Sequence, residues 1–174
     1  MLTTMLLLVA VSVATATDLL RHRIYNWTTY PGILAALAIT AAGVDDITLS
    51  ESLTGLVACG LVMLVCFVMF KIGGGDVKLI AMIGTFLGPE QGIIAMLWTF
   101  VLGGCVGLIV LIWRVGALRL IGRTCRQVLY TLRLGRWSPL SDEEKAVLQP
   151  PLFLAPCALA AVVIVRFALM DLIS

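Results

Sequence analysis

The sequence of 174 residues is 61% hydrophobic and only 13% charged, with a formal net charge of +2 and a mean hydropathy of +1.09. Because soluble domains carry about 25% charged residues, this composition excludes an ordinary soluble globular protein. It predicts an all-α, polytopic membrane protein with a single domain, residues 1–174. The five cysteines form no C-x-x-C pair and there is one histidine, so neither a metal site nor a cofactor is expected. No nucleic-acid partner is expected either.

Six stretches without charged residues predict six transmembrane helices, since about 20 apolar residues cross the hydrocarbon core of a bilayer. They are residues 1–17, 24–44, 52–70, 79–89, 91–113 and 146–165. The first is expected to be a retained helix rather than a signal peptide, because no basic residue precedes it. The second requires Asn26–Thr29 to lie at the interface, the fourth must begin within Gly73–Asp76, and the sixth is expected to kink at Pro156.

Basic residues predict the orientation, because lysine and arginine concentrate in cytoplasmic loops. Arg21 and Arg23 follow the first predicted helix, Lys71 and Lys78 flank the turn between the third and fourth, and six arginines lie in the loop at residues 114–150. Six helices place these three segments on one face, which is therefore expected to be cytoplasmic, with both termini outside. The helical spacing of the loop arginines favours an amphipathic helix on anionic lipids over a solvated loop.

Two aspartates, Asp18 and Asp76, are the candidate catalytic residues. Each lies where an apolar helix meets the expected cytoplasmic face, and ionisable groups at such positions indicate function. The chain crosses the membrane twice between them, so both carboxyl groups can lie at the same depth. Two carboxylates within about 3 Å cannot both ionise, so one keeps a proton while the other acts as a base. Such a pair can activate water for attack on a carbonyl and protonate the carbonyl oxygen.

Three glycines, Gly73, Gly74 and Gly75, directly precede Asp76. Glycine permits positive φ angles and a close approach of another backbone, so an extended substrate peptide could lie against this turn. The alternative is a plain turn between helices, with Asp76 as the N-cap of the helix that follows.

Three basic residues near the aspartates have different expected roles. Arg21 could keep Asp18 ionised or could serve only to set the topology. His22 is expected to be an interfacial residue without a catalytic role, because the pair of carboxyl groups needs no third base. Lys78 is two positions beyond Asp76 on the helix, so it is expected to face away from that carboxyl and to reach lipid headgroups.

Both aspartate segments resemble motifs of the type IV prepilin peptidases. Asp18–Asn26 (DLLRHRIYN) resembles the first aspartate motif of that family, and Gly73–Leu79 (GGGDVKL) resembles its G-x-G-D motif followed by V-K-L. The resemblance implies a GxGD intramembrane aspartic peptidase in which Asp18 and Asp76 are catalytic. Gly73 and Gly75 would then shape the turn. The sequence departs from the family at Tyr25, where a proline usually fixes the turn after the first helix.

The resemblance also implies a substrate and a location. The family comprises bacterial inner-membrane enzymes that remove the short basic leader of prepilins at the cytoplasmic face. Longer members carry an N-terminal segment with paired C-x-x-C motifs and methylate the product. The lack of both here indicates the peptidase-only branch associated with Flp-type, or tight-adherence, pili. The expected partners are a prepilin, with its basic leader and membrane-embedded helix, and anionic lipids.

Two other classes of membrane protein are compatible with parts of the pattern. A proton-coupled transporter could also place two aspartates near one face, although the internal repeat common in transporters is not visible. A structural subunit of a secretion or pilus assembly could use small-residue pairs for helix packing, such as Gly84 with Gly88 and Gly103 with Gly107. A peptidase is favoured, because the two-aspartate pattern and the family motifs agree.

Overall fold

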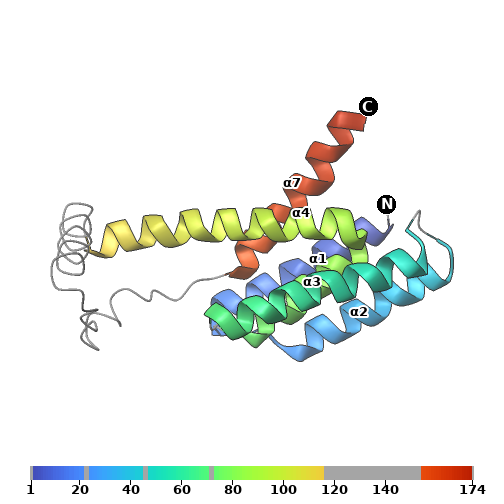
Figure 1. Ribbon diagram of the computed structural model, residues 1–174, viewed down its shortest axis with the longest axis horizontal. Coiled ribbons are helices and arrows are strands. Elements are labelled where there is room, and N and C mark those ends of the chain that lie inside the picture. The colour runs from blue at the N-terminus through green and yellow to red at the C-terminus, as the bar shows by residue number, and fades with distance from the viewer. Residues whose placement is uncertain (1, 22–23, 45–46, 71–72, 116–153, 174) are drawn as a thin grey trace, which may run out of the picture. The chain divides into compact units, whose positions relative to one another are not determined.

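The computed structural model of the protein describes residues 2–21, 24–44, 47–70, 73–115 and 154–173. These residues form five helices and no strand, in agreement with the all-α prediction (Figure 1). The helices are α1 (Leu2–Arg21), α2 (Asn26–Ala41), α3 (Leu49–Phe70), α4 (Gly74–Val115) and α7 (Leu154–Ile173).

Three of the described helices are long and apolar enough to cross a membrane, over Thr3–Arg21, Leu49–Met69 and Gly74–Trp113. The apolar part of α7, Leu154–Phe167, is shorter. The 16 residues of α2 extend about 24 Å at about 1.5 Å per residue, which is less than the hydrocarbon thickness of about 30 Å. The chain is thus a helical membrane protein, and the count of six transmembrane helices stays a prediction.

The chain divides into two compact units. The first comprises Met1–Leu102 and Phe153–Ser174, and the second comprises Gly103–Leu152. In the second unit the described residues are those of the last part of α4, up to Val115. The rest of the predicted basic loop, with its predicted surface helix, lies outside the described residues. Both candidate aspartates belong to the first unit.

The core of the first unit is built around the first half of α4, Gly74–Leu87. Every residue from Leu79 to Gly88 is buried. Around this segment, α1 packs against α2 and α7, and α2 packs against α3 (Figure 1). The largest buried apolar side chains of the core are Leu7, Val11, Met63, Leu79, Ile80, Met82, Ile83, Phe86 and Val162. Apolar residues also cover the exposed faces of the helices, as suits a lipid-facing surface.

Gly88 interrupts α4 and divides it into two helices. Its φ of 77° and ψ of −179° belong to a backbone region that is essentially restricted to glycine. A Cβ atom added at Gly92 would lie 2.9 Å from the Gly84 Cα atom, so the chain turns back after Gly88 and Gly92 packs against Gly84. The fourth and fifth predicted helices correspond to these two halves. The first half begins at Gly74, inside the segment where the prediction required it to begin.

A serine of α3 binds one of the buried carbonyl groups that precede the break. Pro89 has no N–H, so it cannot donate to the carbonyl of Thr85 four residues earlier. Ser52 on α3 donates its hydroxyl to that carbonyl at 2.7 Å, and Ser52 and Thr85 are both 0% exposed. The helices meet closely here, because Gly55 of α3 contacts the backbone of Gly84. This contact agrees with the predicted packing role of the small residues.

Polar contacts join α7 to the rest of the first unit both near its start and further along. Near the start of α7, the Thr15 hydroxyl donates to the carbonyl of Ala155 at 3.1 Å. Further along, Arg166 donates Nε to the Thr4 hydroxyl at 3.0 Å and a terminal guanidinium nitrogen to Gln91 Oε1 at 3.4 Å. Arg166 therefore ties α7 to both α1 and the second half of α4.

The description of α7 begins within the sixth predicted helix. Residues 146–153 of that prediction lie outside the described residues, and α7 is described from Leu154 on. The predicted kink at Pro156 stays a prediction, because the residues that precede Leu154 lie outside the described part of the chain.

Candidate active site

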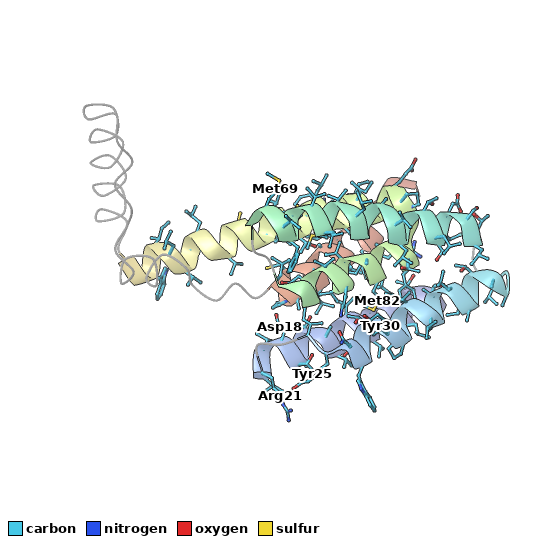
Figure 2. All side chains as sticks on the ribbon, turned by 60° about the horizontal axis from the view of Figure 1, so that its bottom comes forward. Asp18, Arg21, Tyr25, Tyr30, Met69 and Met82 are labelled. Carbon is cyan, nitrogen blue, oxygen red and sulfur yellow. The ribbon has the colours of Figure 1, made fainter. Side chains whose placement is uncertain are left out.

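Asp18 lies in the last turn of α1, which continues to Arg21. The residue is only 9% exposed, and Figure 2 shows it near the end of α1 together with Arg21 and Tyr25. The apolar sequence before it forms the helix, and the helix carries the carboxyl group into the packed region. Burying a carboxyl group at the end of a membrane helix costs free energy, so its presence there indicates a function.

Asp76 lies in the first turn of α4. The helix begins at Gly74, and the N–H groups of Asp76 and Val77 donate to the carbonyl of Gly73 at 3.0 and 3.4 Å. Asp76 is therefore the third residue of the helix, and the alternative that it is the N-cap is wrong. The side chain is half-buried.

The structure brings the two carboxyl groups together. The charge of Asp18 acts on Asp76, so the two lie within electrostatic reach of each other. The chain path explains this: α2 and α3 run in opposite directions between α1 and α4, so the end of α1 and the start of α4 share one end of the first unit (Figure 1). Two neighbouring carboxyl groups favour a state with one proton between them, which supplies an acid and a base at one site.

The three glycines before Asp76 have different surroundings. A Cβ atom at Gly73 would lie 2.9 Å from Asp76 Oδ2, and one at Gly75 would lie 2.9 Å from the Ile24 Cβ atom. A Cβ atom at Gly74 would only meet an aromatic ring at 3.9 Å. None of the three has a positive φ, which among the described glycines occurs at Gly43 and Gly88. Close approach, and not positive φ, therefore explains Gly73 and Gly75.

Arg21 is bound to the residue that departs from the family pattern. It donates a guanidinium nitrogen to the Tyr25 hydroxyl at 3.2 Å. Tyr25 is the N-cap of α2, with φ −82° and ψ 141°. Proline adopts such angles as well, so the tyrosine leaves this turn in a conformation that the usual proline would also give. His22 lies outside the described residues.

Lys78 points to α2, a contact that its position in the sequence did not predict. Its Nζ atom donates to Asn26 Oδ1 at 2.8 Å and lies 5.0 Å from the centre of the Tyr30 ring. Residues of α2 therefore supply partners for Lys78, and its predicted reach to lipid headgroups stays a prediction. A signal was present in the sequence, since Asn26 ends the first aspartate motif and Lys78 lies in the second.

Apolar helices around two neighbouring aspartates define a membrane protein with a candidate acid–base site. Residues 5–108, which include both aspartates and the three glycines, match the type IV leader peptidase family. The match covers more than half of the chain, and the protein belongs to this family of peptidases. No match to a curated protein or to a solved structure accompanies it.

Proposed function

We propose that the protein is a prepilin leader peptidase that works as an intramembrane aspartic endopeptidase, with Asp18 and Asp76 as its catalytic pair. The observation that carries this proposal is the placement of the two carboxyl groups within electrostatic reach, at one end of the first unit. Both lie inside the region that matches the peptidase family.

The pair supplies what hydrolysis of a peptide bond requires. The ionised carboxylate takes a proton from a water molecule, and the water oxygen attacks the carbonyl carbon of the scissile bond. The protonated carboxyl group gives its proton to the carbonyl oxygen, which forms a tetrahedral diol. When the C–N bond breaks, the leaving amine takes a proton from the site and the new carboxyl group is released. No covalent bond to the enzyme forms.

The proposed substrate is a prepilin of the Flp type, cut at the cytoplasmic face of the bacterial inner membrane without N-methylation of the product. A basic leader followed by an apolar helix places the cleavage point at the membrane boundary. Arg21 and Lys78 lie at the aspartate end of their helices, which supports a cytoplasmic position for this end. Trp27, which is 92% exposed near the start of α2, suits the headgroup region. The arginines of the loop at residues 114–150 are proposed to bind anionic lipids.

Co-expression with a prepilin tests the catalytic pair. Asp18→Asn and Asp76→Asn should each abolish leader cleavage, because an amide supplies neither the acid nor the base. Glu90→Gln is the matched control, since it neutralises an exposed carboxylate near the break in α4, and it should cleave normally. Cleavage within about threefold of wild type in either aspartate variant would rule out the aspartic mechanism. Proton uptake into liposomes, with no cleavage of any prepilin, would favour a transporter.

A further inference from the structure

The two aspartate segments are joined by contacts beyond the carboxyl groups themselves. Asp18 is followed, after the end of α1, by a short connection that leads into Asn26, the first residue of α2. Lys78 is in the second turn of α4, two residues after Asp76. The Lys78 ammonium donates to Asn26 at 2.8 Å, so one hydrogen bond spans the two segments.

The Tyr30 ring completes the surroundings of the ammonium. Its centre lies 5.0 Å from Lys78 Nζ, within the distance at which an aromatic face attracts a cation. Asn26 and Tyr30 are one turn apart on α2, so they offer an acceptor and a ring on one face of that helix. We use "lysine clasp" for these three residues, Lys78, Asn26 and Tyr30.

A second contact lies beside the lysine clasp. Gly75 packs against Ile24 in the connection between α1 and α2, so closely that a side chain at Gly75 would collide with it. The connection is also tied back to α1, because Arg21 donates to the Tyr25 hydroxyl. These contacts connect the end of α1 to the start of α2, and the start of α2 to the start of α4. Asp18 lies on α1 just before the first of these contacts, and Asp76 follows Gly75 at the last.

We propose that Lys78 is a positioning residue: bound to Asn26 and Tyr30, it holds the first turns of α4 against α2 and so sets the spacing of the Asp18 and Asp76 carboxyl groups. This inference rests on the proposed function and deepens it. Lys78 acts by fixing the position of Asp76, because the two residues lie on one rigid helical turn and move together. An aspartic pair is sensitive to such movement, since a misplacement of about 1 Å can cost about a hundredfold in rate.

Steady-state cleavage of a purified prepilin in lipid nanodiscs tests the proposal. Lys78→Met removes the donor and the charge, and should lower kcat about tenfold to a hundredfold with KM within about twofold of wild type. Asn26→Leu should act in the same direction. Lys78→Arg keeps a cation that can donate to Asn26 and lie on the Tyr30 ring, and it should restore most of kcat. Asn26→Asp keeps the acceptor and should do the same.

A double variant distinguishes a role of Lys78 and Asn26 through their mutual hydrogen bond from two independent roles. If Lys78 and Asn26 act through their mutual contact, Lys78→Met combined with Asn26→Leu should be no more than about twofold slower than the slower single variant. Glu90→Gln removes one charge outside the lysine clasp and should leave kcat unchanged. Thermal unfolding of every variant gives the folded fraction, and kcat is expressed per folded molecule.

Three results would overturn the role of Lys78. The first is a kcat per folded molecule within about twofold of wild type for Lys78→Met. The second is a rise in KM at constant kcat, which would place Lys78 in substrate binding. The third is a double variant whose loss equals the product of the two single losses. A wild-type protein that cleaves no prepilin refutes the proposed function itself and this role with it, whereas an active wild type with unaffected variants refutes only the role of Lys78.

Discussion

Replacing Ser52 by alanine removes the hydroxyl that satisfies the Thr85 carbonyl at the break in α4. The hydrogen bond measures 2.7 Å, and both residues are 0% exposed. Pro89 has no N–H to offer in its place, and water does not reach so enclosed a site. The variant therefore buries a carbonyl without a partner, which should lower the free energy of unfolding by about 1–3 kcal/mol.

Unfolding in mixed micelles of a mild detergent and sodium dodecyl sulfate, followed by far-ultraviolet circular dichroism, measures this loss. Ser50→Ala is the matched control, because Ser50 lies on the same helix two residues earlier and is exposed. It should change the free energy of unfolding by less than about 0.5 kcal/mol. If Ser52→Ala also stays within about 0.5 kcal/mol of wild type, the Thr85 carbonyl does not depend on Ser52 and the explanation of the break is incorrect.

Three further predictions concern the glycines and the product. Gly73→Ala should lower prepilin cleavage at least about tenfold, because its Cβ atom would press on the Asp76 carboxylate. Gly74→Ala, at a position with more room, should cleave within about threefold of wild type. Equal losses in the two variants would contradict the explanation of Gly73 by its contact with Asp76. Gly88→Ala should lower the free energy of unfolding by about 1–3 kcal/mol, because its positive φ strains any residue with a side chain. Gly104→Ala, which meets nothing within 4 Å, is its control and should cause no loss. Mass spectrometry of a pilin matured by this protein alone should find a free N-terminal amine, and an added methyl group would show that the peptidase-only assignment is wrong.

The sequence predicted the helices well where charge and hydropathy change abruptly. The uncharged runs behind α1 and α3 end before Asp18 and Lys71, and these helices extend to Arg21 and Phe70. The start of α4 at Gly74 followed from a length argument, because residues 79–89 alone are too few to span a bilayer. The proximity of Asp18 and Asp76 was expected from the two crossings that the sequence predicts between them.

The sequence predicted less where the outcome depends on a neighbouring helix. Periodicity places Lys78 on a face of its own helix, but it does not say which residues of α2 lie opposite, and so the contact with Asn26 was missed. Glycine at positions 73 and 75 could have been required for a positive φ or for a close approach of other atoms. Only the packing of Gly73 against Asp76 and of Gly75 against Ile24 shows that close approach is the reason. Such contacts depend on how helices pack, which one sequence without its fold does not reveal.

The first half of α4 is held unequally by its two neighbours. Toward α3, backbone meets backbone, since Gly55 and Gly84 leave no side chain between the helices. Toward α2, the Met82 thioether packs against Gly32, so this contact is made by the far end of a flexible side chain (Figure 2). A backbone contact cannot lengthen unless the helices separate, whereas a methionine can change rotamer at little cost. In mechanical terms α3 and the first half of α4 form a stiff frame, and α2 can yield at Met82 while the lysine clasp holds the first turn of α2 beside Asp76.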